Sequence, residues 1–234
     1  MSKSAGSGSR HLTVRVKTAK RRKSGSTRWL QRQLNDPFVA EAKRLGYRSR
    51  AAFKLIQLDE RFGLLRKGQR IVDLGAAPGG WSQIAAQKVG PAGHIVAIDY
   101  LEMTPMAGVT VLHKDFLDDD APAVLKTALG GPADLVLSDM AAPTTGHAKT
   151  DHLRIMALAE VAHAFAAEVL SPGGAFVAKL FQGGAEKGLL DLLKADFTTV
   201  RHAKPSASRS DSAETYVVAQ GFRGAGGDAH TGAG

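Results

Sequence analysis

One lysine lies in a segment whose other residues are apolar. Lys179 belongs to the run AFVAKLF, which is typical of a buried β-strand. Burial and neighbouring cations lower the pKa of an ammonium group, and a lysine with a lowered pKa can accept a proton near neutral pH. An edge strand, from which the ammonium group reaches water, is the alternative interpretation. The pattern makes Lys179 a candidate general base.

Three other polar residues stand near the ends of predicted elements. Asp139 ends the run ADLVLSD, and ligands of α/β sheets bind beyond the carboxyl ends of the strands. Asp139 is therefore a candidate ligand or catalytic acid. Lys54 lies in the predicted helix SRAAFKLIQLDERFGLL, where spacing alone fits a rim lysine without a role. Glu214 precedes the predicted strand TYVVAQGF and is unremarkable by itself.

A glycine-rich turn lies in IVDLGAAPGGWSQIAAQ, between a predicted strand and a predicted helix. Gly75, Ala77 and Gly80 fall where a dinucleotide-binding loop has three glycines, so the middle glycine is missing. Trp81 stands where a phosphate-binding P-loop has its lysine. A small-residue turn of this kind suits a nucleoside ligand without phosphates, and S-adenosylmethionine is one.

Carboxylates at the next strand ends agree with that ligand. Asp99 ends HIVAID, where a carboxylate can accept both ribose hydroxyls of an adenosine, although it would suit NAD equally well. Asp115 follows the next apolar run and could bind an adenine edge, or it could be a loop acid or helix cap. Asp73, beside the turn, could instead brace the loop.

Strand-like and helix-like segments alternate along the chain. Their rhythm, with continuous apolar strands, predicts an α/β fold with an open, mostly parallel sheet covered on both faces. The predicted strands are residues 70–74, 94–99, 109–115, 133–139, 175–181, 197–203 and 215–222, and the main predicted helices are 49–63, 81–89, 152–170 and 188–196.

The positive charge of the chain is concentrated near its N-terminus. Residues 1–54 hold 15 Lys and Arg against two acids, whereas the remaining 180 residues hold 16 basic and 20 acidic side chains. This distribution favours a segment that binds a polyanion, attached to a nearly neutral core. A solubilising tail is the alternative.

Cysteine is absent, which excludes disulfides, thiolate metal sites and a cysteine nucleophile. The eight histidines lack metal-ligand spacing, so we expect no metal site. No apolar run is long enough for a membrane span. We expect a cytoplasmic protein. The acid-free N-terminus has the composition of an organelle transit peptide but no amphipathic stripe, so mitochondrial import is the minor alternative.

Five motifs together resemble the FtsJ-type family of ribosomal RNA large-subunit methyltransferases. They are SRAAFKL, DLGAAPGGWSQ, SDMA, LSPGGAFVAKLFQG and KPSASRSDSAETY, and they occur in the family's order. The resemblance covers nearly the whole chain between the basic N-terminus and the glycine-rich tail. One segment departs from the pattern, since SDMA is followed by APTTGHAKTDH, so contacts from residues 141–152 are not carried over.

The resemblance implies a Rossmann-like class I methyltransferase fold with a seven-stranded sheet. It implies S-adenosylmethionine as cofactor and the ribose 2′-hydroxyl of a uridine in the A loop of 23S rRNA as acceptor. The family's Lys-Asp-Lys-Glu tetrad falls on Lys54, Asp139, Lys179 and Glu214. Its cofactor positions fall on Gly79, Trp81, Asp99, Asp115 and Asp139.

In the reaction that the resemblance implies, Lys179 takes the hydroxyl proton while the oxygen attacks the sulfonium methyl group in line. Lys54 lowers the pKa of Lys179 and holds the RNA, and Asp139 and Glu214 orient the lysines and the hydroxyl. Two other functions remain open. A nicotinamide-dependent oxidoreductase would need the missing glycine, and a non-catalytic RNA-binding module would bind rRNA with little affinity for S-adenosylmethionine.

Three regions are expected: a basic arm (1–35), a methyltransferase domain (36–222) and a glycine-rich tail (223–234). The expected partner is 23S rRNA, within the large ribosomal subunit. We expect a monomer that does not associate with membranes.

Overall fold

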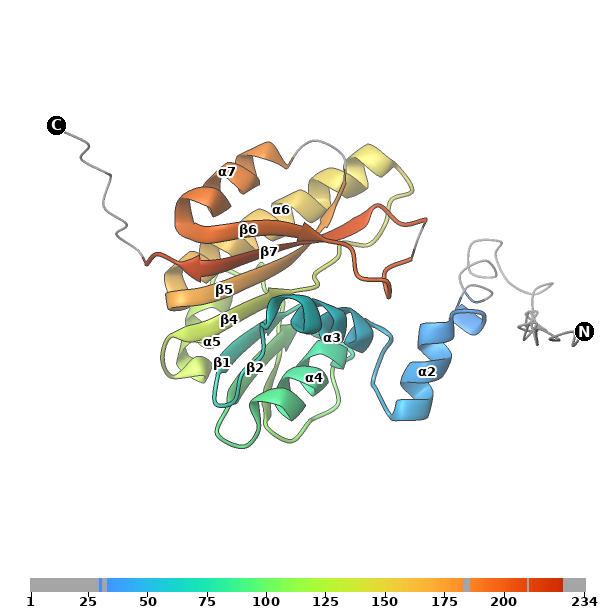
Figure 1. Ribbon diagram of the computed structural model, residues 1–234, viewed down its shortest axis with the longest axis horizontal. Coiled ribbons are helices and arrows are strands. Elements are labelled where there is room, and N and C mark those ends of the chain that lie inside the picture. The colour runs from blue at the N-terminus through green and yellow to red at the C-terminus, as the bar shows by residue number, and fades with distance from the viewer. Residues whose placement is uncertain (1–29, 31–32, 183–185, 210, 225–234) are drawn as a thin grey trace, which may run out of the picture.

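A mixed sheet forms the centre of the protein, as the computed structural model in Figure 1 shows. The structure describes residues 30, 33–182, 186–209 and 211–224. The strands of these ranges are β1 (Arg70–Leu74), β2 (His94–Asp99), β3 (Val109–His113), β4 (Ala133–Ser138), β5 (Leu170–Phe181), β6 (Phe197–Ala203) and β7 (Glu214–Phe222). The helices are α2 (Pro37–Leu45), α3 (Ala51–Phe62), α4 (Gly80–Val89), α5 (Ala121–Leu129), α6 (Ala148–Val169) and α7 (Lys187–Asp196).

The seven strands lie in the order β3-β2-β1-β4-β5-β7-β6. The pairs from β3 to β5 are parallel, and β7 is antiparallel to both β5 and β6. The predicted seven-stranded, mostly parallel sheet is therefore confirmed. From β1 the chain runs outward to β2 and β3 and then returns to β4 on the other side. This reversal creates a crevice at the carboxyl ends of β1 and β4, where α/β sheets bind ligands.

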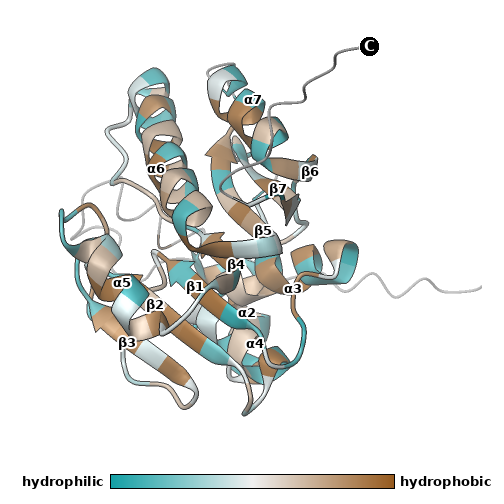
Figure 2. Ribbon diagram, turned by 90° about the vertical axis from the view of Figure 1, so that its left-hand side faces the viewer, coloured by the Kyte–Doolittle hydropathy of each residue, from teal (hydrophilic) through white to brown (hydrophobic). Residues whose placement is uncertain are grey.

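Helices cover both faces of the sheet. One apolar core lies between the sheet and helices α5, α6 and α7, and a second lies between the sheet and helices α3 and α4. Because both faces are buried, the parallel strands are apolar at nearly every position rather than alternating with polar residues. Figure 2 shows this hydrophobic colouring along the central strands.

The polar loop after Asp139 is shorter than its sequence predicts, since α6 begins at Ala148 rather than at residue 152. Asp151 stabilises this helix start because its carboxylate accepts hydrogen bonds from the Thr145 amide, the Thr145 hydroxyl and the Gly146 amide. An acid in the first turn also complements the positive end of the helix dipole.

All of these elements lie between Pro37 and Phe222. The expected arm (1–35) and tail (223–234) lie almost entirely outside the described residues and stay predictions. Among the helices of the described ranges, none is long and apolar enough to cross a lipid bilayer.

Candidate active site and cofactor cavity

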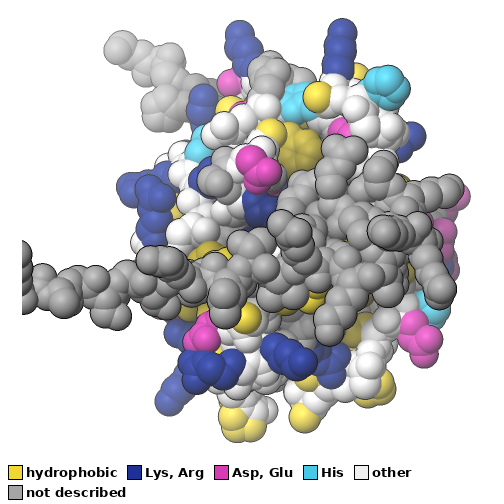
Figure 3. All heavy atoms as spheres, turned by 90° about the vertical axis from the view of Figure 1, so that its right-hand side faces the viewer, with side chains coloured by type: hydrophobic (Ala, Val, Ile, Leu, Met, Phe, Trp, Pro, Cys, Tyr) yellow, Lys and Arg dark blue, Asp and Glu magenta, His cyan; other side chains and the backbone are white. Residues whose placement is uncertain are grey.

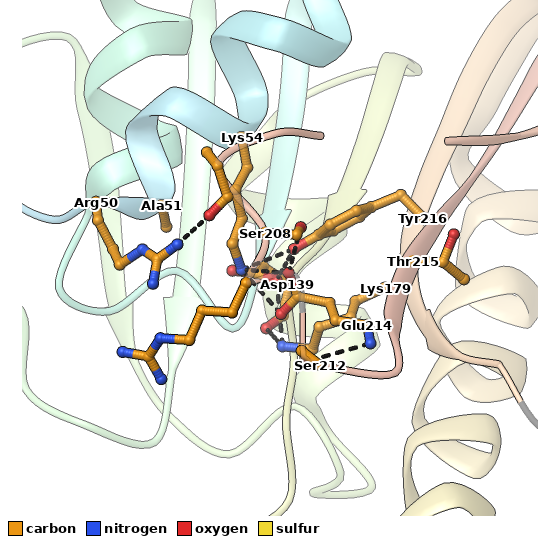
Figure 4. Close-up of polar contacts among 12 residues, drawn as sticks. Arg50, Ala51, Lys54, Asp139, Lys179, Ser208, Ser212, Glu214, Thr215 and Tyr216 are labelled. Atoms are coloured by element: carbon orange, nitrogen blue, oxygen red, sulfur yellow. Dashed lines mark hydrogen bonds and ion pairs between the residues drawn. The ribbon is translucent and has the colours of Figure 1, made fainter. Parts of the chain in front are cut away.

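Four sequence-predicted residues meet at the carboxyl end of β4. Lys54 comes from α3, Asp139 directly follows β4, Lys179 lies on β5 and Glu214 begins β7. The register of the sheet brings them together, because Ser138 pairs with Ala178 and Lys179 pairs with Tyr216. Figure 4 shows Lys54, Glu214 and Tyr216 gathered around Asp139.

Lys179 is held by Asp139. Its strand pairs with β4 on one side and β7 on the other, so the edge-strand interpretation is wrong. The side chain is buried, and its Nζ lies 2.6 Å from the Asp139 carbonyl oxygen and 3.1 Å from Asp139 Oδ1. Two of the N–H directions of Lys179 are therefore used, and no other group of the described ranges occupies the third position on the nitrogen.

Lys54 is buried as well, which excludes the rim position that its spacing allowed. Its Nζ lies 2.8 Å from Glu214 Oε1, 2.9 Å from Glu214 Oε2 and 3.1 Å from the Tyr216 hydroxyl oxygen. An ammonium group has three N–H donors. Lys54 thus has an acceptor for every proton, whereas Lys179 keeps a free position as far as the described part of the chain shows.

Tyr216 is a member of the site that sequence reasoning missed. Its hydroxyl accepts from Lys54 and donates to Asp139 Oδ1 at 2.8 Å, so it connects the Lys54–Glu214 pair to the Lys179–Asp139 pair. The signal in the sequence was the strand alternation, since residues two apart on a strand share a face. Tyr216 and Glu214 are two apart on β7 and therefore point to the same side.

The pKa values of the site reflect burial and these contacts. Burial acts to raise the pKa of Asp139, but the Lys179 and Lys54 cations and the hydrogen bond from Tyr216 outweigh it, so the pKa lies below its ordinary value. Burial raises the pKa of Tyr216 well above its ordinary value, and the Asp139 and Glu214 carboxylates add to this. Asp139 is therefore an anion and Tyr216 a neutral hydrogen-bond donor.

The loop between β6 and β7 orients Glu214. Ser208 is buried, and its hydroxyl donates to Glu214 Oε1 at 2.7 Å. The preceding residue, Ala207, accepts a hydrogen bond from the Arg50 guanidinium through its carbonyl oxygen and donates to Gln57 Oε1 through its amide. Both partners belong to the α3 region, so this loop is fixed against the helix that carries Lys54.

A cavity of about 430 Å³, here called the cofactor cavity, opens beside Asp139. Its lining combines carboxylates with apolar side chains and the backbone of the glycine turn. The residues are Gly75, Ala77, Ile98, Asp99, Tyr100, Leu101, Asp115, Phe116, Leu117, Asp139, Met140, Ala141, Ala142, Pro143 and Leu158. Three of the predicted cofactor residues, Asp99, Asp115 and Asp139, thus face the same cavity.

The two carboxylates from β2 and β3 are pre-oriented by backbone amides. Asp99 accepts from the Ala77 amide at 2.9 Å and from the Leu101 amide at 2.8 Å. Asp115 accepts from the Leu117 amide at 3.0 Å, as a loop acid would. Each carboxylate has about four lone-pair positions. Both therefore keep acceptor capacity toward the cavity.

Gly79 and Trp81, the other predicted cofactor residues, do not line this cavity. Trp81 is buried, donates from Nε1 to the Ala51 carbonyl oxygen at 2.8 Å and packs against the Tyr216 ring. A Cβ on Gly79 would meet the side chain of Met103 at 2.9 Å. The glycine that faces the cavity is Gly75, whose φ of +74° and closeness to Met140 exclude a side chain.

Asp73 lies beneath the glycine turn and is fully buried. Burial raises its pKa to about 7, although a hydrogen bond from Ser82 opposes this, and the nearby Asp139 and Asp99 charges raise it further. The Ser82 hydroxyl donates to Asp73 Oδ2 at 2.6 Å, while Oδ1 has no hydrogen-bond partner among the residues that the structure describes. The bond to Ser82 joins β1 to the first turn of α4 and supports the interpretation that Asp73 braces the loop.

A second cavity, of about 390 Å³, lies on the other side of the tetrad and is here called the acceptor cavity. Its lining is mostly polar and comprises Gln33, Arg50, Ala51, Lys54, Arg209, Asp211, Ser212 and Glu214. The tetrad separates the two cavities, because Asp139 faces the first while Lys54 and Glu214 face the second. In the described ranges no three His, Asp or Glu side chains are grouped as metal ligands.

Comparison with known proteins identifies the family of the chain. A family model described as FtsJ-like methyltransferase matches residues 47–222. The chain is 71% identical over 222 residues to "Ribosomal RNA large subunit methyltransferase E" of Paramagnetospirillum magneticum, with 93% of this chain and 91% of the relative covered. The protein of the same name from Rhodospirillum rubrum is 63% identical, with 98% of this chain and 89% of the relative covered.

Among solved structures, a crystal structure of a Plasmodium falciparum protein named as a ribosomal RNA methyltransferase is similar with a TM-score of 0.67 and 32% identity. It is matched over its whole length and over 76% of this chain. The extent of the family match and the identity to these relatives place the chain clearly. The chain belongs to the FtsJ-like methyltransferase family.

Proposed function

We propose that the protein transfers the methyl group of S-adenosylmethionine to the ribose 2′-hydroxyl of a uridine in large-subunit ribosomal RNA, with Lys179 as the base. The observation that carries the proposal is the position of the tetrad between two cavities. One cavity has the carboxylates and apolar walls of a nucleoside site, and the other is polar and open to a larger substrate. Methyl transfer needs donor and acceptor held next to each other and in line, and residues that border both cavities lie where the two would meet.

The cofactor cavity fits S-adenosylmethionine. Asp99 would accept the ribose hydroxyls, Asp115 would accept from the adenine amino group, and the apolar side chains of Leu101, Phe116 and Leu117 would pack against the base. Gly79 and Trp81 do not line this cavity, so the proposal gives neither of them a contact with the cofactor. When bound there, the cofactor supplies a methyl group on a positively charged sulfur.

The two lysines have different roles because their hydrogen bonds differ. Lys54 has an acceptor for each of its three protons, which keeps it a fixed cation. Among the described residues Lys179 donates to Asp139 alone, so the third position on its nitrogen is available to the lone pair of the neutral amine, which takes the proton of the 2′-hydroxyl. This assignment agrees with the base predicted from the sequence.

Asp139, Glu214 and Tyr216 hold the lysines in place. Asp139 fixes Lys179 through two contacts and faces the cofactor cavity, so it aligns the base with the methyl donor. Glu214 neutralises Lys54, and Tyr216 joins the two ion pairs. Alignment of the hydroxyl oxygen with the methyl group supplies much of the rate, since the donor is already activated.

The identity of the acceptor rests on the relatives, which are named as methyltransferases of large-subunit ribosomal RNA. Their bacterial origin favours action in the cytoplasm over import into an organelle. The uridine and its 2′-oxygen rest on the motif resemblance and on the tetrad, which is suited to a hydroxyl acceptor.

Methyl transfer from labelled S-adenosylmethionine to undermodified large ribosomal subunits tests the proposal, followed by mapping of 2′-O-methyl nucleotides. We expect one labelled ribose, on a uridine. Lys179→Ala should lose at least about a hundredfold in rate, as removal of a general base does. An unchanged rate would contradict the assignment of Lys179 as the base.

Saturable NAD binding without binding of S-adenosylmethionine would favour an oxidoreductase, and RNA binding without transfer would favour a binding module.

A further inference from the structure

Within the acceptor cavity, Arg209 differs from the other cations in its hydrogen bonds. Its Nε lies 3.6 Å from Asp36 Oδ2, too far for a strong hydrogen bond, and in the described part of the chain its two terminal nitrogens donate to no partner. Its side chain is 31% exposed, so the guanidinium group is accessible. Arg209 therefore presents a fork of unused donors to the cavity.

The other cations of the cavity are already neutralised. Lys54 is paired with Glu214, and the Arg50 guanidinium donates to Asp36 and to the Ala207 carbonyl oxygen. Asp36 is almost completely buried and also accepts from the Phe38 amide, so it caps α2. Asp36 thus ties the start of α2 to the start of α3 and sets the direction of Arg209.

The acids that line the cavity do not pair with Arg209 in the described residues, and Asp36, its ion-pair partner at 3.6 Å, is shared with Arg50. Glu214 is occupied by Lys54 and Ser208. Asp211 is exposed at the rim and forms no ion pair in the described residues. The cavity consequently offers one accessible guanidinium group and one exposed carboxylate, and a negative ligand would be attracted by the first and repelled by the second.

The chemistry of the proposed acceptor supplies such a ligand. In RNA the carbon that carries the 2′-hydroxyl is bonded to the carbon whose oxygen continues into a phosphodiester. The acceptor cavity is lined by Lys54 and Glu214 of the tetrad as well as by Arg209, so it adjoins the place where the 2′-oxygen would react and could hold this phosphodiester. A guanidinium fork matches two phosphate oxygens in geometry and charge. Figure 3 shows lysine and arginine side chains on several parts of this α2 side of the molecule.

We propose that Arg209 binds the phosphodiester on the 3′ side of the methylated ribose, and that Asp36 is the positioning residue that directs it. The inference rests on the proposed function and adds a phosphate site to it. The site fixes the acceptor strand at the nucleotide where transfer occurs. It contributes to RNA binding and leaves the binding of S-adenosylmethionine unchanged.

The test compares Arg209→Gln with Arg70→Gln. Arg70 begins β1, so this exposed arginine lies at the opposite end of the strands from the site, and its variant loses the same charge. We expect Arg209→Gln to raise KM for undermodified large subunits about tenfold, the effect of losing one charge-assisted hydrogen-bonded contact. The slope of log affinity against log salt should fall by about 0.7 to 0.9, the value for one phosphate contact.

Two further variants separate charge from geometry. Arg209→Lys should keep the salt slope but recover only part of the affinity, because lysine lacks the fork. Asp211→Asn should lower KM, since it removes a carboxylate close to the phosphate. The dissociation constant for S-adenosylmethionine and the Tm of each variant serve as folding controls.

The inference would be overturned if Arg209→Gln had the same KM and the same salt slope as Arg70→Gln. It would also be overturned if Arg209→Gln lost kcat and affinity for S-adenosylmethionine to the same extent. The failure of the proposed function gives a different result. In that case the unaltered protein would transfer no methyl group to large-subunit RNA, and the phosphate site would fall with it.

Discussion

The hydroxyl of Tyr216 connects two ion pairs. The loss of stability and of activity when this hydroxyl is removed can be estimated from its contacts. Tyr216→Phe keeps the ring, which packs with its centroid 5.6 Å from that of Trp81, so the substitution isolates the oxygen. Lys54 loses one of three acceptors, and Asp139 loses its 2.8 Å donor but keeps Lys179. Hydrogen bonds to charged groups contribute about 1.5–3 kcal/mol.

Because Tyr216 is fully buried, water cannot replace the hydroxyl. We therefore expect the free energy of unfolding to fall by about 2 kcal/mol. For a chain of this length that loss corresponds to a decrease in Tm of about 4–8 °C. The value of kcat/KM should fall about tenfold, since Asp139 holds the base less rigidly, and a tenfold change equals about 1.4 kcal/mol.

The assay pairs thermal unfolding with methyl transfer to undermodified large subunits. Tyr47→Phe is the matched control, because Tyr47 packs against Phe53 with its ring and its hydroxyl forms no hydrogen bond in the described structure. The control should retain both its Tm and its rate. If Tyr216→Phe behaves like Tyr47→Phe in both measurements, the hydroxyl does not couple the ion pairs and the reasoning is wrong.

Three other predictions follow from charged and basic groups. Burial raises the pKa of Asp73 from an ordinary 3.8 to about 7, so between these pH values the native state holds a proton that the unfolded state has lost. The free energy of unfolding should therefore decrease as the pH rises from about 4 to about 7. Asp73→Asn should abolish this decrease when the free energy of unfolding is measured by denaturant titration at a series of pH values. An unchanged slope of that free energy against pH would contradict the raised pKa. Asp99→Asn should weaken binding of S-adenosylmethionine by about tenfold or more in calorimetry, since one anionic acceptor of ribose hydroxyls becomes neutral; an equal loss in RNA binding would point to misfolding instead. Deletion of residues 1–35 should weaken RNA binding and reduce its salt dependence, because this segment contains most of the excess positive charge; an unaltered salt slope would leave it a solubilising tail.

Most of the fold was predictable because it follows from local patterns. The alternation of apolar strands with helices predicted a parallel sheet, and Asp99, Asp115 and Asp139 at strand ends predicted its ligand edge. Lys54 and Glu214 were not predictable from spacing, since their contact joins residues 160 positions apart. Only the family resemblance brought them together, and the structure then confirmed their contact.

The remaining differences have physical causes. Strand alternation places Tyr216 on the same side as Glu214, but the partners of its hydroxyl come from α3 and from the residue that follows β4, and local sequence gives no sign of those contacts. Trp81 follows a glycine turn and looked like a ligand residue. It is instead buried between α3 and β7, because the turn directs the side chain away from the cavity.

The place of β7 in the sheet has a consequence for the order of folding. This strand is the last of the described sheet in sequence, yet it lies between β5 and β6, and β6 has no other partner. While the chain is being synthesised, β5 has an unpaired edge and β6 cannot join the sheet, and exposed edges of this kind promote aggregation. The same strand contributes Glu214 and Tyr216. The nascent protein therefore acquires its complete catalytic group only when its last strand is inserted, in the same step that closes the sheet.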